Sequence, residues 1–321
     1  MLELDETDRK ILHQLDLDCR QSIPRIAKKV GAKKDTVAFR IKRLVSRKII
    51  TKFITEVNTS KLGYIGMKGY FQFQNYTEEM EKEFFDYLGT FRQMGWIVSC
   101  TGRWDAMIVY WGKSAFEFHR SYLQILDKYS KYVVSKEIAQ NMKWFWYNRK
   151  WLIGHDQNPV GYEHGGEPST VKLDALDRAI LSCLISDGRM PVVEIAKSVK
   201  TTPQNVINRM RRMKSEGVIA KFGIDINYKK LGIIFCKTFV YLQNVTEKKL
   251  EAIFAYCKRQ PNVFALVNTL GPWDLELELE VENFEQVTMI MNGMRSHFGD
   301  TIRNYESVIV SKQTTVRHVE Y

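Results

Sequence analysis

The chain contains the same two-part segment twice, at a constant offset of 169 residues. Residues 4–63 and 173–232 align without a gap and are identical at 24 of 60 positions. The offset persists further along, because the tetrapeptide GRWD at 102–105 falls on GPWD at 271–274. A repeated unit of this length constrains the architecture before individual residues are considered. Two copies are too few for a solenoid, so the sequence predicts a fused pair of ordinary two-domain units.

The length and composition are those of a globular protein. A chain of 321 residues with 45% hydrophobic content can form about two to four domains. It has no run of about 18 apolar residues, so we expect no membrane span, and its acidic, polar start argues against a signal peptide. The five cysteines include no CxxC pair, and we expect them to be reduced thiols in a cytoplasmic protein.

The positive charge is confined to the start of each copy. The net charge is +11, and residues 1–63 contribute +7 from 15 Lys/Arg against 8 Asp/Glu. Residues 173–232 contribute +5 from 11 against 6, which leaves −1 for everything else. Charge kept only for solubility would be spread along the chain. Charge confined to two small segments instead indicates a polyanionic partner, and nucleic acid is the partner that we expect.

Each basic segment has the pattern of three short helices followed by a strand. In the first copy Asp5 is a candidate cap for the first helix, and Lys33 stands where the third helix lacks one. In the second copy Thr202 caps the third helix and Pro203 takes its first position. The first-copy helices are expected at about 5–17, 22–30 and 34–47, and the following β-rich segments at 49–57 and 218–226.

Three short helices with a tight break before the third are typical of a helix-turn-helix, and the following strands predict a wing. The start of the third helix would then enter the major groove of DNA. For each single basic residue, a solvated surface charge is the alternative. The candidate base-reading residues are Asp35, Thr36, Phe39 and Lys42, with Gln204, Asn205, Asn208 and Arg211 in the second copy. The candidate phosphate contacts are Arg40, Arg43, Arg47 and Lys48, with Arg209, Arg212 and Lys214 in the second copy.

These segments resemble the opening of a known family. The first copy contains LDETDRKIL and, further on, DCRQSIPRIAKKVGAKKDTVAFRIKRLVSRKII. The second copy contains LDALDRAIL and, further on, DGRMPVVEIAKSVKTTPQNVINRMRRMKSEGVI. Both copies resemble the opening of the Lrp/AsnC (feast/famine) transcription regulators. The resemblance covers nearly the whole chain, because the segment after each helix-turn-helix also fits that family. It implies double-stranded DNA as a partner and an amino acid or related metabolite as the effector.

The segment after each basic module has the order strand, helix, strand, strand, helix, strand. This order is the ferredoxin-like split βαβ pattern, which matches the sensing and oligomerising domain of the family. The sequence therefore predicts an α+β protein with two winged helix-turn-helix domains, each followed by a ferredoxin-like βαββαβ domain. The expected domains are 1–65 and 66–151 in the first copy, a linker at 152–171, and 172–234 and 235–321 in the second copy.

A Gly-x-x-Asp signature lies between the second and third strands of each ferredoxin-like domain. The family resemblance places Gly102, Asp105, Gly271 and Asp274 near the effector pocket. The alternative is that the glycine makes a turn and the aspartate caps it. Tyrosine is common between these residues in the family, whereas both copies have tryptophan here.

The third strands of the two ferredoxin-like domains differ in pattern. The second copy alternates leucine with Glu276, Glu278 and Glu280, which predicts one buried and one polar face. The first copy has Met107, Val109 and Trp111 at the positions of the glutamates. We expect this apolar face to be covered in an interface between domains. The acidic face is expected to be either exposed or paired with basic residues such as Lys237.

The segment 143–151, KWFWYNRKW, places basic residues among aromatic ones. Stacking on bases is one use of such residues, but packing against a neighbouring domain is the interpretation that we favour. The Gly- and Pro-containing residues 152–171 read as the linker between copies. His155 and His164 share that linker, and without Cys/His metal spacing around them we expect no metal site.

Enzyme signatures are absent from the sequence. It contains no HExxH, GxSxG, P-loop or Cys/His metal spacing, so we expect no enzyme, metal or cofactor. Siroheme decarboxylases resemble this family and share its two-part fold, so an enzyme acting on a tetrapyrrole is the alternative, although no defined His/Arg motif is matched. The sequence thus predicts a sequence-specific DNA-binding transcription regulator that is a homo-oligomer or an intrachain pseudo-dimer.

Overall fold

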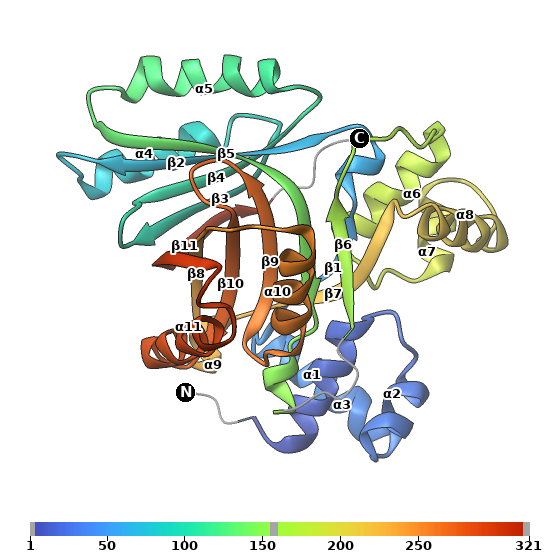
Figure 1. The fold of residues 1–321 in the computed structure, drawn as a ribbon. Helices are drawn as coiled ribbons and strands as arrows, with labels where there is room; N and C mark the ends of the chain where they lie inside the picture. The colour runs from blue at the N-terminus through green and yellow to red at the C-terminus, as the bar shows by residue number, and fades with distance from the viewer. Residues whose placement is uncertain (1–3, 155–159, 317–321) are drawn as a thin grey trace.

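The computed structural model describes residues 4–154 and 160–316 and is drawn in Figure 1. We call residues 4–151 copy one and residues 172–316 copy two. Each copy consists of a three-helix module and a ferredoxin-like domain, in the order expected from the sequence. None of the helices in these ranges has the length and apolar character that crossing a bilayer requires.

The three-helix module of copy one follows its sequence pattern closely. Helix α1 (Glu6–Leu17) begins at Asp5, whose carboxylate accepts a hydrogen bond from the backbone N–H of Asp8 at 2.8 Å. Gly31 ends helix α2 in the left-handed conformation that glycine tolerates well. Lys33, at the start of α3, makes no side-chain capping bond, as expected. The remaining helices are α2 (Ile23–Val30) and α3 (Lys34–Ser46).

The corresponding module of copy two has better-capped helices. At the start of the third helix, the Thr202 side chain accepts from the N–H of Asn205, and Pro203 occupies the first helical position. Asp174 and Asp177 form a reciprocal capping box at the start of the first helix. The Thr202 bond confirms the predicted start of the third helix. The helices are α6 (Ala175–Ser186), α7 (Val192–Ser198) and α8 (Pro203–Ser215).

The strands expected to form two separate wings pair with each other instead. Strand β1 (Ile50–Val57) is antiparallel to β7 (Ile219–Ile226) in a two-stranded sheet, which we call the ribbon. Apolar side chains of the ribbon, such as Ile50 and Ile224, belong to one buried cluster together with Ile11 and Ile180 from the two modules. A single core therefore joins both helix-turn-helix modules, and burying these side chains explains why the strands do not project as independent wings.

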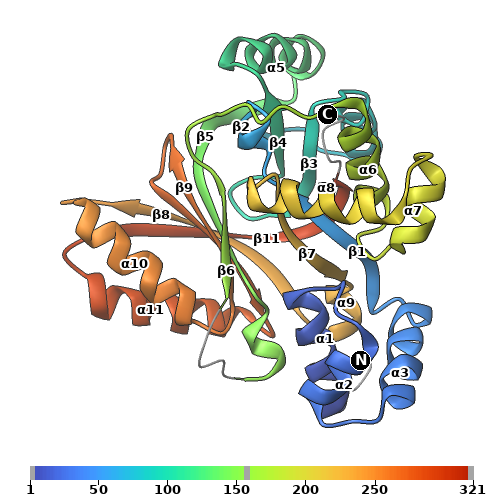
Figure 2. The same ribbon diagram turned by 90° about the vertical axis from the view of Figure 1, so that its right-hand side faces the viewer.

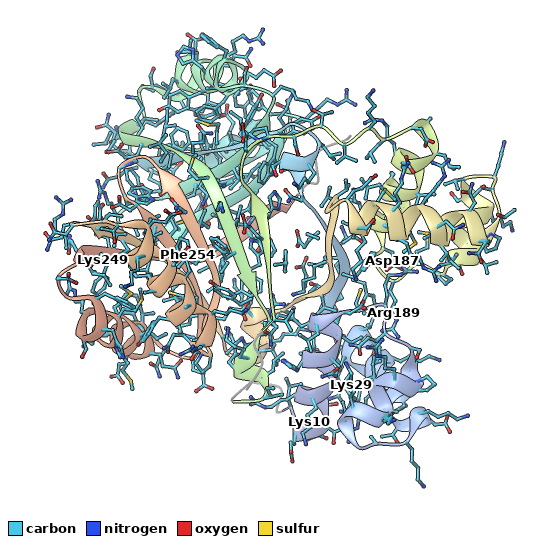
Figure 3. The ribbon with its side chains drawn as sticks, turned by 45° about the vertical axis from the view of Figure 1, so that its right-hand side comes forward. Lys10, Lys29, Asp187, Arg189, Lys249 and Phe254 are labelled. Carbon is cyan, nitrogen blue, oxygen red and sulfur yellow. The ribbon has the colours of Figure 1, made fainter. Side chains whose placement is uncertain are left out.

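The loops after α1 and α6 also connect the two modules. The Arg20 guanidinium donates hydrogen bonds to the backbone oxygens of Gly188 and Met190 at 2.9 and 3.0 Å. In Figure 3, Asp187 and Arg189 of copy two lie beside the copy one module that carries Lys29. Figure 2 shows the two modules on either side of the ribbon, with α1–α3 on one side and α6–α8 on the other.

Both ferredoxin-like domains have the predicted order of elements. Figure 1 shows their helices in two separate pairs, α4 with α5 and α10 with α11. The elements of copy one are β2 (Ile65–Phe73), α4 (Glu78–Leu88), β3 (Met94–Thr101), β4 (Ala106–Gly112), α5 (Ala115–Tyr129) and β5 (Val133–Tyr147). Those of copy two are β8 (Ile234–Leu242), α10 (Glu247–Arg259), β9 (Val263–Leu270), β10 (Leu275–Val281), α11 (Phe284–Phe298) and β11 (Ile302–Val316).

The last strand of each ferredoxin-like domain crosses into the other copy. The first half of β5 pairs with β2 of its own copy, and its second half pairs with β9 of copy two. In the same way β11 pairs with β8 and then with β3 of copy one. The strand order is β2-β4-β3-β11-β8-β10-β9-β5, and the β2–β5 pairing closes the ring. The chain is therefore a pseudo-dimer with itself, one of the two arrangements that the sequence left open.

The segment expected to be a linker contains ordered structure. Strand β6 (Gly161–Gly165) pairs with the second half of β5, beyond the point where β2 ends. A short helix, η2 (Lys150–Leu152), precedes it. Two further short helices, η1 (Thr59–Lys61) and α9 (Tyr228–Leu231), follow the ribbon strands. We call the closed ring of eight strands from β2 to β5 the barrel, and β6 extends from it by pairing with β5.

Candidate functional site

The outward residues of α3 are placed as the sequence predicts. Phe39 is 64% exposed, which is unusual for an aromatic side chain without a partner surface. Thr36, Lys42 and Arg47 are also exposed. The helix therefore presents an apolar ring among polar and basic side chains, which can contact a thymine methyl and the adjacent phosphates.

Helix α8 presents a different set of side chains at the matching positions. Gln204 donates to the Asn208 side chain at 2.9 Å, and both residues are exposed. Asn205 is held more firmly, because its amide donates to the Thr201 hydroxyl at 2.9 Å. Arg211 is exposed. Amide and guanidinium groups can read adenine and guanine edges, so α3 and α8 differ in what they can recognise.

Four of the arginines expected to contact phosphates are engaged in ion pairs. Arg40 contacts Asp5 at 2.5 Å and the nearly buried Asp8 at 3.0 Å, and Arg43 contacts Asp8 at 2.6 Å. These pairs fasten the third helix of the module to the first. Contact of these arginines with DNA remains a prediction, to be weighed against this structural role.

Copy two repeats the arrangement. Arg209 contacts Asp174 at 2.7 Å and Asp177 at 2.8 Å, and Arg212 also pairs with the fully buried Asp177. The hydrogen bonds from Arg209 hold the pKa of Asp174 low, at about 2. The signal for these pairs was present in the sequence, because both aspartates and both arginines recur at the same offset.

The Gly-x-x-Asp loops also have identifiable structural roles. The carboxylate of Asp105 accepts from the N–H of Phe73 at 2.7 Å, and that of Asp274 accepts from Leu242 at 2.7 Å. A Cβ atom on Gly271 would lie 2.8 Å from that of Ala139 on β5.

The glycine of copy one is in an equivalent environment. A Cβ atom on Gly102 would lie 3.1 Å from the Val308 side chain on β11. The glycines thus permit close approach of the other copy's last strand. These contacts support the alternative in which the glycine and aspartate of each loop shape the backbone. An effector role for the four residues remains a prediction.

The acidic face of β10 is buried and paired inside the barrel. Glu276 accepts hydrogen bonds from Lys68 at 2.6 Å and from Tyr70, and it contacts Lys237 at 2.9 Å. Glu278 contacts Lys237 at 2.7 Å. Of the two alternatives for this face, pairing with bases such as Lys237 is confirmed and exposure is wrong.

Burial and charge act in opposite directions within this cluster. Burial disfavours the ionised form of Glu276, but Lys237 and Lys68 lower its pKa to about 2. Burial lowers the pKa of Lys68 to about 8, against the attraction of Glu276. Lys68 belongs to copy one, whereas both glutamates belong to copy two. The cluster therefore connects the two copies.

Arg149 connects the barrel to a helix-turn-helix module. Its guanidinium contacts Asp16 on α1 at 2.7 Å and Glu280 on β10 at 3.0 Å. It also donates to the backbone oxygen of Ile224 on the ribbon and to the Tyr228 hydroxyl. The prediction that segment 143–151 packs against neighbouring domains is confirmed by these buried contacts.

A cavity of about 750 Å³ lies between the ribbon and the barrel, and we call it the central cavity. Its lining includes aromatic residues from β3 to β6 and from β9, together with charged residues of the ribbon. Sequence reasoning did not predict it, because the cavity forms only when strands from both copies close around it. The residues that characterise it are Trp96, Trp111, Trp144, Trp146, Tyr162 and Phe264.

His164 belongs to the lining of the central cavity. Its Nε2 atom is 2.8 Å from the Thr59 hydroxyl, and its ring stacks on Trp111 with centroids 5.1 Å apart. Across residues 4–154 and 160–316, no three His, Cys, Asp or Glu side chains gather in a way that could hold a metal ion. His155, the other linker histidine, lies outside the described residues.

Comparison with known sequences identifies the repeated module. Residues 4–45 and 173–214 each match the AsnC-type helix-turn-helix domain. An uncharacterised helix-turn-helix transcriptional regulator of Pyrococcus horikoshii is 28% identical over 39% of this chain and 84% of its own length. The transcriptional regulator LrpC of Bacillus subtilis is 26% identical over 38% of this chain and 83% of its own. Each of these relatives therefore corresponds to one copy.

Comparison with solved structures finds the whole architecture. The siroheme decarboxylase NirDL superposes with a TM-score of 0.63 at 13% identity, covering 99% of this chain and 94% of that chain. NirDL has also been solved with an iron-uroporphyrin III analogue, and that structure superposes with a TM-score of 0.61. At this level of identity the match shows a shared fold.

Proposed function

The chain is a tandem relative of the Lrp/AsnC transcription regulators, with the AsnC-type helix-turn-helix domain present twice, and we propose that it is a sequence-specific DNA-binding regulator. Double-stranded DNA is its proposed partner, and the cytoplasm its proposed location. A small metabolite, of the amino acid class or related to it, is the proposed effector. The function proposed is regulatory and not enzymatic.

One observation carries this proposal: both recognition helices present exposed polar and basic side chains on modules that share one core. Phe39 and Lys42 are exposed on α3, and Asn208 and Arg211 are exposed on α8. The ribbon and its core hold the two helices in a fixed relation within one chain. Such a chain can engage two half-sites without a second protein molecule.

Salt dependence of DNA binding tests the proposal. Two docked modules neutralise several phosphates, so the logarithm of affinity should fall against the logarithm of salt with a slope of about −5 or steeper. Fluorescence anisotropy of a labelled duplex between low and physiological salt measures this slope. A slope near zero would reject DNA binding as the function.

Variants that each remove one positive charge locate the surface that contacts DNA. Arg47→Ala and Lys214→Ala, both exposed candidate phosphate contacts, should each reduce the magnitude of the slope by about 1, because each removes about one phosphate contact. Lys249→Ala removes the same charge from α10, away from both modules (Figure 3). This control should leave the slope unchanged, and an equal effect from all three would indicate attraction by net charge alone.

A second function is supported by the central cavity together with the full-length match to NirDL. A cavity of about 750 Å³ with aromatic walls and a histidine is large enough for a tetrapyrrole. An enzyme acting on such a substrate is therefore the competing proposal. Titration with iron uroporphyrin, followed by visible absorbance, tests it. A saturable shift of the absorbance band that His164→Ala abolishes would favour the enzyme, and an unchanged spectrum would remove it.

A further inference from the structure

The walls of the central cavity are flat and aromatic. The Trp146 ring lies 5.6 Å from Tyr162 and 5.8 Å from Phe264, centroid to centroid. Trp111 lines the same space and is covered on one face by His164. Trp96 from β3 adds a further indole. Surfaces of this kind bind planar ring systems by stacking, which depends little on the identity of the ring.

One wall also carries hydrogen-bond donors that have no acceptor. The indole N–H groups of Trp144 and Trp146 and the hydroxyl of Tyr162 are buried and lack a partner among the described residues. Trp146 and Tyr162 are register partners in the β5–β6 hairpin, and all three residues line the cavity. Buried polar groups without partners are costly and uncommon in folded proteins. The donor atoms themselves are closed to a water molecule, so a ligand with carbonyl or ring-nitrogen acceptors would satisfy them once these side chains turn toward the cavity.

The opposite wall is the ribbon, and its charges are balanced. Lys52 and Glu56 from β1 and Lys221 and Asp225 from β7 all line the cavity. Burial, strengthened by the nearby Asp225, raises the pKa of Glu56 to about 8, and burial also raises the pKa of Asp225. Neither carboxyl forms an ion pair within the described residues. Such groups accept hydrogen bonds from ligand N–H groups and disfavour a ligand with many carboxylates.

From these walls we infer that the central cavity binds a neutral, planar heteroaromatic compound of two or three fused rings. Its ring system would stack among the tryptophans, its carbonyl or ring-nitrogen edge would face the Trp144, Trp146 and Tyr162 donors, and its N–H edge would face the ribbon carboxyls. The volume of about 750 Å³ exceeds what a single amino acid fills. This site is distinct from the Gly-x-x-Asp loops.

Because the cavity lies beside the ribbon that carries both modules, such a ligand would regulate DNA binding. This regulatory role rests on the proposed function. Helix α1 packs against β7, and helix α6 packs against β1, so both modules rest on the ribbon. Arg149 ties the same ribbon to Glu280 of the barrel. A ligand that fills the space between ribbon and barrel therefore alters the relative placement of α3 and α8.

Binding of two fluorescent or ultraviolet-absorbing probes to the full chain tests the assignment. Riboflavin and guanosine both carry a fused, neutral heterocycle with carbonyl and N–H groups on its edge. We expect at least one of them to bind saturably by isothermal titration calorimetry. Tyr162→Phe and Trp146→Phe should each weaken that binding by about three- to tenfold, because each removes one donor and keeps an aromatic ring.

Trp104→Phe is the matched control. Trp104 is fully buried and its indole N–H also lacks a partner, but it belongs to an apolar cluster and does not line the cavity. This variant should bind the probe as the parent does. Failure of both probes to bind, or equal losses in all three variants, would overturn the assignment. Binding of L-tryptophan or iron uroporphyrin in place of both probes would overturn the ligand class.

Measurements on DNA separate this inference from the proposed function. With saturating probe, the affinity of the parent for its duplex should change at least about threefold, whereas Tyr162→Phe at the same probe concentration should change less. Probe binding by a chain that does not bind DNA would reject the proposed function and leave the cavity assignment standing. DNA binding that the bound probe leaves unchanged would reject the regulatory role.

Discussion

The third strands of the two ferredoxin-like domains occupy equivalent positions but contribute opposite chemistry. On β4 the inward face carries Met107 and Val109, which pack in apolar clusters. On β10 the same face carries Glu276 and Glu278, which pair with buried lysines. Both faces are covered by the other half of the chain. Burial alone therefore does not distinguish the two copies, and the difference lies in which copy supplies the negative charge.

The lysines show why this difference matters. Lys68 and Lys237 are equivalent residues of the repeat, and both are fully buried. Only copy two supplies carboxylates, so Lys68 depends on Glu276 across the interface. Two copies of the first half would bury lysines without acids, and two copies of the second half would bury twice as many acids for the same number of lysines. The two halves have become complementary to each other and unsuited to self-pairing.

Glu276→Gln should have the largest effect. It leaves Lys68 and Lys237 buried with one carboxylate between them, and breaking a buried pair typically costs about 3–5 kcal/mol. Urea unfolding of the full chain measures the loss. Lys249→Ala, which breaks the exposed pair with Asp300, should cost less than about 1 kcal/mol. Similar losses of stability from the two variants would mean that the buried Glu276 cluster stabilises the fold no more than an exposed ion pair does.

Val109→Glu should be the next most damaging change. It adds a carboxylate to an apolar cluster with Trp144 and should destabilise the pairing of the copies by about 2–4 kcal/mol. Val109 is the register partner of Lys68, so the new carboxylate faces that lysine. Combining it with Glu276→Gln should therefore restore part of the stability, with a favourable coupling of about 1 kcal/mol or more. Strictly additive losses of stability would show that a carboxylate on β4 cannot replace the Glu276 carboxylate of β10 as the partner of Lys68.

Glu278→Ala should be less costly than Glu276→Gln but not neutral. A neutral effect is expected only on a solvated face, whereas Glu278 is 4% exposed and pairs with Lys237. Because Lys237 keeps its contact with Glu276, we expect a loss of about 1–3 kcal/mol. Thermal melts alongside the urea series measure it. An unchanged melting temperature would show that Glu276 alone balances both lysines.

Glu56→Gln should have the smallest effect near pH 4.5, and its effect should grow as pH rises. The pKa of Glu56 is raised from its ordinary value of 4.5 to about 8, with Asp225, Lys221, Arg149 and Lys52 as its charged neighbours. Because the folded chain holds the Glu56 proton more tightly than the unfolded chain does, this group stabilises the fold fully below pH 4.5. That stabilisation is lost as pH rises through 8. The variant should match the parent near pH 4.5 and be more stable at pH 8. Parallel stability curves would place Glu56 in solvent.

Much of the fold could be predicted because its signals are local or repeated. Capping residues such as Asp5 and Thr202 fix helix starts within a few residues. The alternation on β10 correctly predicts one face of leucines and one of glutamates. The pairing of the ribbon strands and the crossing of β5 into copy two were not predicted, because either depends on contacts between residues about 120 or more positions apart.

The candidate sites also divide into features that a local pattern predicts and features that depend on contacts between distant residues. The outward positions of α3 and α8 follow from helical periodicity, so Phe39 and Arg211 were found from the sequence. The pairing of Arg40 with Asp8 was not predicted, although both residues recur at the same offset in copy two, and the central cavity was not predicted because it depends on the distance between separate elements. A periodic pattern indicates which side chains share a face, but it does not indicate which element covers that face.

Selection of binding sites from random DNA tests most directly the claim that one chain acts as a pseudo-dimer of two unlike halves. We expect enriched sites with two different half-sites, centred about 34 Å or a multiple of that apart. Asn208→Ala should relax specificity in one half only, at a cost of about 1–3 kcal/mol. Perfect palindromes among the selected sites, or relaxation in both halves from this single change, would contradict the account.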